Sequence, residues 1–395
     1  MSLYPTPNLI ALYGSEAATK WLAAASSAGA VTEIAVSPVV GALVDSLGRK
    51  PVVICTMLFV AAAFATVGTC TSGALLPLFG LSSAATATVA ATTATATASA
   101  AAATAAGAAT SSLPLPPAAT AALLVGCKYL SGCVVGFFFL AASAMLADLH
   151  RDDATGLSGA MAVLFSLVNL GFGVGVSLSG LLPKELPLPY LLSASLAFVG
   201  AAALALAVPE TLPKSDRRAF DGPKVRRALL SPISFLRLLR SGPTLRRLTL
   251  LTALHSAPIF MGDVMQVFVT TEWALAKSEV VQLFSIVAFT GVISNVAAAA
   301  GAIAALGTRG FTALATASNL LFWVSMSLDH RRALAGAVVG FLGPARGLVS
   351  GASLASEGAK LGMSQGQIAG DRANLFAILK VSFSYLLNRL FIVSE

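Results

Sequence analysis

Charged side chains are scarce in this sequence. Only 11% of the 395 residues are Asp, Glu, Lys or Arg, 56% are hydrophobic, and the mean hydropathy is +0.84. A soluble protein of this size needs more polar side chains to cover its surface, so that class is excluded. The apolar runs are long rather than alternating, and in lipid each backbone polar group must find its partner within the protein. The sequence therefore predicts an all-α membrane protein.

Cysteine and histidine are also rare. The four cysteines lie inside apolar runs, where a thiol behaves as a small hydrophobic group rather than as part of a disulfide framework. The three histidines and the cysteines show no metal-binding spacing. The sequence contains neither a phosphate-binding Gly-x-x-x-x-Gly-Lys-Ser/Thr loop nor a nucleophile elbow. We therefore expect no enzymatic activity, no cofactor and no bound metal.

Ten apolar runs, bounded by charges or by proline and glycine, predict transmembrane helices. The predicted spans are 22–44, 51–72, 119–147, 156–182, 188–208, 246–270, 280–304, 310–328, 333–356 and 373–393. Between the second and third spans, residues 82–112 are almost wholly Ala, Thr, Ser and Val. We interpret this segment as a low-complexity loop, the alternative being an eleventh helix.

Lysine and arginine collect in alternate loops, most densely at 214–247. Cytoplasmic loops carry such an excess, so these loops are placed in the cytoplasm and both termini outside. Arg372, just before the last span, is counted among the loop cations. The net charge of +8 is thereby explained without nucleic-acid binding. We expect an exoplasmic segment, an N-terminal helix bundle, a basic cytoplasmic linker and a C-terminal helix bundle, at residues 1–21, 22–208, 209–245 and 246–395.

The loop after the first span has the pattern Gly-x-Leu-x-Asp-x-x-Gly-Arg-Lys. Its residues are Gly41, Leu43, Asp45, Gly48, Arg49 and Lys50. This pattern resembles the cytoplasmic signature of the major facilitator superfamily and is the most specific signal in the chain. The resemblance implies two helix bundles that move by alternating access.

Each residue type in this pattern has a physical use. Gly41 would let two helices approach closely, Gly48 would permit a tight turn, and Asp45 would pair with Arg49 or cap a neighbouring helix. Such a contact holds in one conformation and breaks in the other, so we predict a gate. The alternative is a basic loop that only sets the topology.

In the family the signature joins the second and third of twelve helices. Here only one span precedes it, and the chain ends after the counterpart of the eleventh helix. The resemblance thus covers ten helices, and we expect the first and last to be absent. A faint echo of the motif, at residues 301–309, lies at the matching place in the second half and supports two related halves.

Further motifs favour the tetracycline-efflux-like drug/proton antiporter branch of the family. Gly171, Gly175 and Gly180 are similar to the glycines of its Gly-x-x-x-Gly-Pro-x-x-Gly-Gly motif, although the proline is replaced. They are predicted to pack helices closely, as small residues also do in unrelated membrane helices. Residues 145–156 and 364–370 resemble the end of the fourth helix and the loop after the tenth in that branch.

Ionisable residues inside spans are costly in lipid and therefore indicate function, or an ion pair between helices. Glu33 is predicted to exchange a proton, because low dielectric favours a neutral carboxyl. Lys128 falls where many family members have an arginine and is predicted to influence such a carboxylate, or to reach the outer interface. Asp263 is predicted to line the cavity, and Arg346 to contact an anionic substrate or a carboxylate. Lys380 is expected to extend to the cytoplasmic interface.

Taken together, these features predict a secondary active transporter of a small organic solute, with proton-coupled efflux as the leading hypothesis. Its expected partners are the substrate, protons and the lipid bilayer, and we expect a monomer. The alternatives are a facilitative or symport carrier of a sugar or organic anion, and a truncated membrane scaffold that does not transport.

Overall fold

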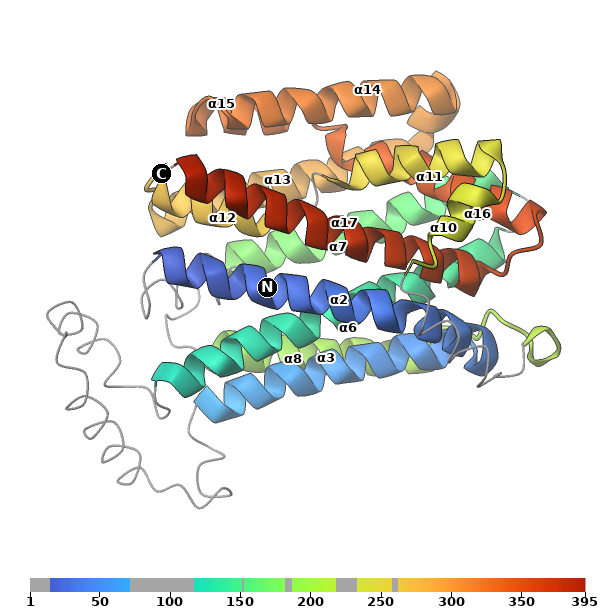
Figure 1. Ribbon diagram of the computed structural model, residues 1–395, viewed down its shortest axis with the longest axis horizontal. Helices are drawn as coiled ribbons and strands as arrows, with labels where there is room; N and C mark the ends of the chain where they lie inside the picture. Colours follow the sequence, from blue (N-terminus) through green and yellow to red (C-terminus); the bar gives the residue numbers. More distant parts are fainter. Residues whose placement is uncertain are drawn as a thin grey trace, which may run out of the picture.

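The computed structural model describes residues 15–71, 117–150, 153–181, 187–217, 233–257 and 262–394, and the described part contains helices and no strand. The low-complexity segment 82–112 lies outside these residues. The helices are α2 (Ser15–Leu47), α3 (Arg49–Thr71), α6 (Pro117–Leu149), α7 (Ala154–Leu181), α8 (Pro187–Ala207), α10 (Leu236–Arg240), α11 (Pro243–Ser256), α12 (Gly262–Thr271), α13 (Lys277–Ala297), α14 (Ile303–Met326), α15 (His330–Val339), α16 (Leu348–Lys360) and α17 (Gln365–Ser394). Most run roughly along the long axis of the molecule (Figure 1).

Six described helices are long and apolar enough to cross a membrane. They are Ala24–Leu47, Arg49–Thr71, Ala119–Leu149, Thr155–Leu178, Pro187–Ala207 and Lys277–Ala297. A seventh is α15 with residues 343–360, if this pair, bent by 57°, is counted as one span. The chain is therefore an integral, multi-pass membrane protein.

The other predicted spans are helical but interrupted or charged. The span predicted at 246–270 is described as two helices, α11 and α12, and residues 258–261 between them lie outside the described part. The span at 333–356 is broken at Gly343–Gly347, where Pro344 lacks the amide hydrogen that an α-helix needs.

The start of the last span was also predicted too late, because α17 begins at Gln365 rather than near residue 373. The sequence placed the boundary after Asp371 and Arg372, since charges normally end a span. In the structure, however, the Asp371 carboxylate pairs with Arg237 of α10 at 3.0 Å. The charge is satisfied within the protein, and the helix continues through it.

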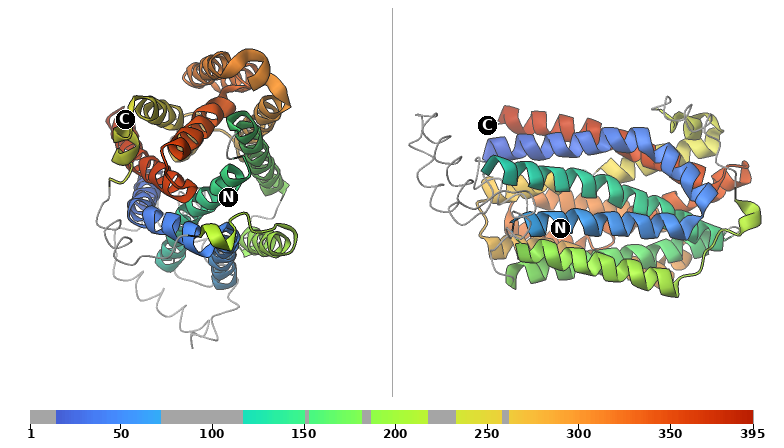
Figure 2. Two further views of the ribbon diagram at one scale, coloured as in Figure 1. Left: turned by 90° about the vertical axis from the view of Figure 1, so that its right-hand side faces the viewer. Right: turned by 90° about the horizontal axis from the view of Figure 1, so that it is seen from below.

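The two halves of the chain meet along two seams. Helix α2 packs on α17, and α7 packs on α13, so each seam joins a helix before residue 208 to one after residue 246. Helices α14 and α15 form one edge of the molecule, and α3 and α8 form the opposite edge (Figure 1). Figure 2 shows the same helices end-on and from below.

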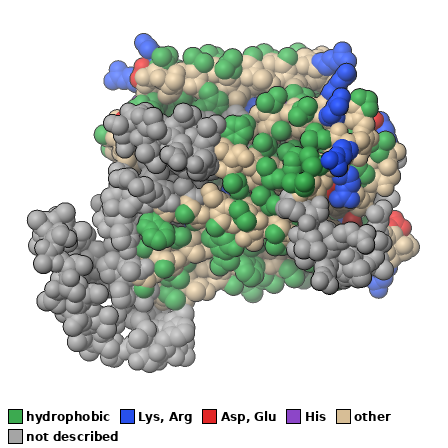
Figure 3. Space-filling view, viewed as in Figure 1, with side chains coloured by type: hydrophobic (Ala, Val, Ile, Leu, Met, Phe, Trp, Pro, Cys, Tyr) green, Lys and Arg blue, Asp and Glu red, His purple; other side chains and the backbone are tan. Residues whose placement is uncertain are grey.

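Lysine and arginine side chains gather at the end where α10 lies, with a smaller group over α15 at the other end (Figure 3). We call the first end the basic end; α2 and α6 finish there, and α7 and α17 begin there. Hydrophobic side chains dominate the belt between the two groups. The assignment of the basic end to the cytoplasm stays a prediction.

Two apolar clusters, one toward each end of the molecule, include residues of both halves. The basic-end cluster contains Leu157 of α7, Phe311 of α14 and Leu348 of α16. The opposite-end cluster contains Val176 of α7 and Met326 of α14, with side chains of α12 and α13. Since α7 and α14 contribute to both clusters from opposite ends, their central residues lie between two apolar layers.

Candidate functional site

The turn between α2 and α3 requires a glycine. Gly48 has φ +106°, a region that favours glycine. Glu210 accepts hydrogen bonds from the backbone amides of Arg49 at 2.9 Å and Lys50 at 3.2 Å. A Cβ on Gly48 would collide with the same carboxylate. The echo in the second half turns in a similar way, because Gly307 has φ +69°.

These hydrogen bonds predict the outcome of replacing Glu210. Glu210→Ala leaves two backbone donors at the start of α3 without their acceptor, so we expect the free energy of unfolding to fall by about 1–3 kcal/mol. Thermal unfolding of the detergent-solubilised protein measures the loss. The control is Glu357→Ala, which removes an exposed pair with Lys360 and is expected to change little. Equal losses in both variants would contradict this reading.

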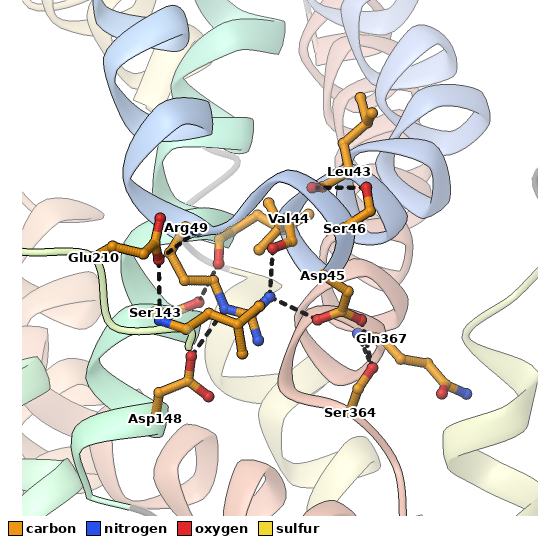
Figure 4. Close-up of polar contacts among 12 residues, drawn as sticks. Leu43, Val44, Asp45, Ser46, Arg49, Ser143, Asp148, Glu210, Ser364 and Gln367 are labelled. Carbon is orange, nitrogen blue, oxygen red and sulfur yellow. Dashed lines mark hydrogen bonds and ion pairs between the residues drawn. The ribbon is translucent and has the colours of Figure 1, made fainter. Parts of the chain in front are cut away.

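Arg49 lies at the centre of a buried charge network (Figure 4). Its side chain is 2% exposed, and its guanidinium pairs with Asp45 at 2.6 Å and Asp148 at 2.9 Å. It also donates to the Val44 carbonyl oxygen at 2.6 Å. The Asp45–Arg49 pair is one of the two roles that the sequence suggested for Asp45. Asp148, which the sequence marked only as part of a branch motif, is the second carboxylate.

Asp45 also contacts the second half of the chain. Its Oδ2 accepts a hydrogen bond from Ser364 Oγ at 2.6 Å, and Ser364 Oγ in turn accepts from the backbone amide of Gln367 (Figure 4). Beside this contact, a Cβ on Gly41 would lie 2.7 Å from the carbonyl oxygen of Gly366. The close approach predicted for Gly41 therefore takes place between α2 and α17.

The remaining signature residues support the turn from within the first half. Leu43 packs against the buried cluster formed by Val40, Val44 and their neighbours. Lys50 Nζ donates to the Ala205 carbonyl oxygen of α8 at 2.6 Å.

A second polar contact between the halves lies further along the same seam. Glu33 Oε1 of α2 is 3.4 Å from Lys380 Nζ of α17, with side chains 12% and 22% exposed. Lys380 was expected to reach the interface, and this was wrong, because the buried carboxylate gives it a closer partner. Asn374 Nδ2 reinforces the seam by donating to the Ile34 carbonyl oxygen at 2.9 Å. Lys128 lies partly buried on α6.

A cavity of about 500 Å³ lies between the two apolar clusters. Its lining comes from both halves: Phe139, Met161, Phe165, Val168, Asn169, Phe172, Thr252, His255, Ser256, Val287, Ala288, Thr290, Asn295, Asn319, Phe322, Trp323, Ala337, Gly340, Gly343, Pro344, Arg346, Gly347, Leu348, Gly351, Ala352, Arg372 and Phe376. Cavities of this size accommodate small organic molecules.

Arg346 is the predicted site residue that lines this cavity. It is 7% exposed, and the break at Gly343–Gly347 brings it to the lining. Its Nε donates to the His255 carbonyl oxygen at 2.8 Å, and its Nη1 donates to the Gly343 carbonyl oxygen at 3.0 Å. Glu33 lies instead on the α2–α17 seam. Asp263 is on α12, and its side chain lies outside the described part of the structure.

Sequence reasoning missed a charged lining residue, Arg372, whereas it had placed His255 on a polar side of the 246–270 span that could line the cavity. Arg372 was taken for a loop cation, but it lies on α17 and faces the cavity. His255 is buried on α11, with its ring nitrogens 3.4 Å from Ser350 Oγ and 3.2 Å from Thr316 Oγ1. One signal in the sequence could have identified Arg372. It stands next to Asp371, and two adjacent charged residues are too short a segment to form a loop between helices.

Comparison with known proteins places this arrangement in a known fold. No protein-family model matches the chain, and no curated protein matches it significantly. The crystal structure of the human organic anion transporter MFSD10 (TETRAN), a major facilitator protein, is 19% identical with a TM-score of 0.64, over 98% of this chain and 90% of that chain. The chain has the major facilitator fold.

A second solved structure is more distant. The major facilitator proton:xylose symporter XylE, bound to 6-bromo-6-deoxy-D-glucose, is 15% identical over 100% of this chain and 86% of that chain, with a TM-score of 0.48. The antiporter branch and the absence of a first and a last helix stay predictions.

Two glycines of the antiporter-like motif, Gly171 and Gly175, do not lie at the close approach of α7 to α13. A Cβ on Gly171 or Gly175 would meet no atom within 4 Å, whereas one on Gly173 would lie 3.2 Å from the Ala288 Cβ. The residue spacing identified the right helix but the wrong face, because two steps along a helix turn a side chain by about 200°. Gly180 lies on α7, outside the residues whose burial is described.

Proposed function

We propose that this protein is a secondary active transporter of a small organic solute that works by alternating access. The observation that carries the proposal is the cavity, which both halves line and which lies between two apolar clusters. A binding space that both halves line is what a carrier needs if the halves rock around it to open it to one side at a time.

The signature loop supplies the gate in this proposal. Asp45 is held on the first half by Arg49 and reaches Ser364 on the second half. When α2 and α17 separate at the basic end, the Asp45–Ser364 hydrogen bond and the Gly41–Gly366 contact break, and the Asn374–Ile34 hydrogen bond further along the seam breaks with them. The Arg49 network remains intact within the first half, so the two halves can move as rigid bodies.

Glu33 and Lys380 supply the proton coupling in this proposal. Their ion pair joins the halves in the conformation described here. Protonation of Glu33 removes its charge and weakens the attraction, so it favours separation of α2 from α17. Proton entry coupled to solute exit would follow if the cavity opens to the basic end while Glu33 is protonated. This is proton-coupled efflux.

Accessibility of the cavity tests alternating access without a known substrate. In a variant that lacks the four native cysteines, Thr252→Cys places one thiol in the lining. A membrane-impermeant thiol reagent is added to one side or the other of oriented vesicles, at pH 5.5 and pH 7.5. We expect labelling from each side to change in opposite directions with pH. Equal labelling from both sides would indicate a channel. The absence of labelling from either side would favour the alternative of a membrane scaffold that does not transport.

Glu33→Gln tests the coupling residue. The amide cannot titrate, so we expect the pH dependence of Thr252→Cys labelling to disappear while the labelling itself persists. The matched control is Glu357→Gln, which neutralises a carboxylate paired with Lys360 on the surface and is expected to keep the pH dependence. If labelling in Glu33→Gln keeps its normal pH dependence, the proposal that Glu33 couples transport to protons is refuted, and a facilitative carrier is favoured.

A further inference from the structure

The cavity has an uneven distribution of charge. Arg346 and Arg372 both line it, and no aspartate or glutamate is among the described residues of the lining. Neither arginine forms an ion pair with any residue that the structure describes. A guanidinium keeps its charge throughout the physiological range, and an uncompensated charge in a membrane interior is costly. A ligand that brings negative charge would offset that cost.

Arg346 is held in place without being neutralised. Its two hydrogen bonds go to backbone carbonyl oxygens, of His255 and Gly343, which carry only partial charges. Its Nη2 makes no hydrogen bond to a described residue, although the side chain is 7% exposed. The guanidinium is therefore oriented by the fold and retains a donor for a bound molecule.

Arg372 approaches the cavity from α17. Its guanidinium carbon lies 5.8 Å from the ring centre of Phe376, which also lines the cavity. Across from it, a Cβ on Gly351 would lie 3.2 Å from Arg372 Nη1, so the glycine of α16 leaves room for the guanidinium. The aromatic ring stabilises the cation weakly and leaves its edge nitrogens available.

The lining also holds buried hydrogen-bond donors that lack partners. Thr252 Oγ1 and Trp323 Nε1 are buried and make no hydrogen bond with the described residues. Thr252 is 3% exposed, so water outside the cavity does not satisfy it. Buried donors normally have partners, and both of these residues belong to the cavity lining together with the arginines. The rest of the lining is rich in aromatic rings, with Phe139, Phe165, Phe172 and Phe322 in addition to Trp323 and Phe376.

From this geometry we infer that the cavity binds an organic anion with an aromatic body, whose carboxylate or sulfonate lies against Arg346 and Arg372. The flat side chains of the lining contact its apolar part. As a statement of substrate class the inference rests on the proposed transport function, but as a statement of binding it is testable alone.

Binding to the purified full chain tests the inference directly. The protein is placed in nanodiscs of phosphatidylcholine, so that no anionic lipid competes for the arginines. The probe is tritiated naphthalene-2-sulfonate, which is ionised at every working pH. Its competitors are the neutral naphthalene-2-sulfonamide and a naphthylmethyl trimethylammonium cation of similar size. We expect saturable binding of the sulfonate, with neither competitor displacing it at equal concentration.

Substitutions then locate the site. Arg346→Gln and Arg372→Gln are each expected to weaken sulfonate binding at least about tenfold, and Arg346→Lys and Arg372→Lys to weaken it less. The control is Arg309→Gln, which removes an exposed cation outside the cavity lining and is expected to bind as the wild type does. Size-exclusion profiles and thermal unfolding confirm that each variant folds. If Arg346→Gln does not fold, Arg372→Gln and the two lysine variants still decide the question.

The outcomes separate this inference from the proposed function. If the sulfonamide or the cation binds as tightly as the sulfonate, if the arginine variants bind normally, or if the sulfonate does not bind, the anion site is overturned. The transport proposal would then still stand on the accessibility of Thr252→Cys. If the sulfonate binds through the arginines but Thr252→Cys is never labelled from alternate sides, the site stands and the transport function fails.

Discussion

Replacement of Arg49 by alanine is expected to lower the free energy of unfolding by about 3–5 kcal/mol, among the largest effects of any single substitution in the chain. The reason is that two carboxylates, 11% and 4% exposed at Asp45 and Asp148, would lose their shared counter-ion while remaining buried. Thermal unfolding in detergent, followed by size-exclusion of the remaining folded protein, measures the change.

Two further variants serve as controls for Arg49→Ala. Arg49→Lys keeps the charge but not the forked geometry, so it is expected to recover part of the loss. Arg332→Ala removes an arginine whose side chain is 66% exposed and which pairs with Asp329, so it is expected to change stability little. A loss no larger in Arg49→Ala than in Arg332→Ala would mean that the network does not hold the first half together.

Gly41→Ala is expected to open the basic end of the α2–α17 seam. The added Cβ would lie 2.7 Å from the Gly366 carbonyl oxygen, which is backbone and cannot turn aside. Overpacking of this kind costs about 1–3 kcal/mol, and only the conformation with the seam closed bears that cost. The balance should therefore shift toward the open conformation by roughly five- to a hundredfold.

Labelling of Thr252→Cys from the basic end measures this shift. The matched control is Gly171→Ala, because a Cβ there would meet no atom within 4 Å, and the helix propensity gained is the same in both variants. We expect faster labelling in Gly41→Ala and unchanged labelling in Gly171→Ala. Identical rates in the two variants would show that the contact does not act as a gate.

The contacts between α2 and α17 could be predicted only in part from the sequence. Gly41 and Asp45 were recognised by their spacing, which is a local property of the chain. Their partners, Ser364 and Gly366, lie more than 300 residues away and were interpreted only as part of a loop motif. Nothing in a single sequence states that α2 and α17 are neighbours.

The charged residues inside the predicted spans were also only partly interpreted from the sequence. A charged group is costly in a lipid environment and is therefore rare in a transmembrane span. For this reason Glu33 and Arg346 were recognised as candidate functional residues. Lys380 and Arg372 were misread because each stands near a predicted span end, where a cation ordinarily reaches water. In the fold, Lys380 reaches Glu33 at 3.4 Å and Arg372 reaches the cavity.

The sequence by itself determined that this is a helical membrane protein, where most helices lie and that residues 41–50 form a turn of the major facilitator kind. These follow from the length of apolar runs and from local spacing, which lipid and backbone geometry constrain directly. Only the tertiary structure decided which helices meet, which charges pair and that two arginines share one cavity. Those depend on contacts between segments far apart in the chain, and the free energy of each contact exists only once both segments are in place.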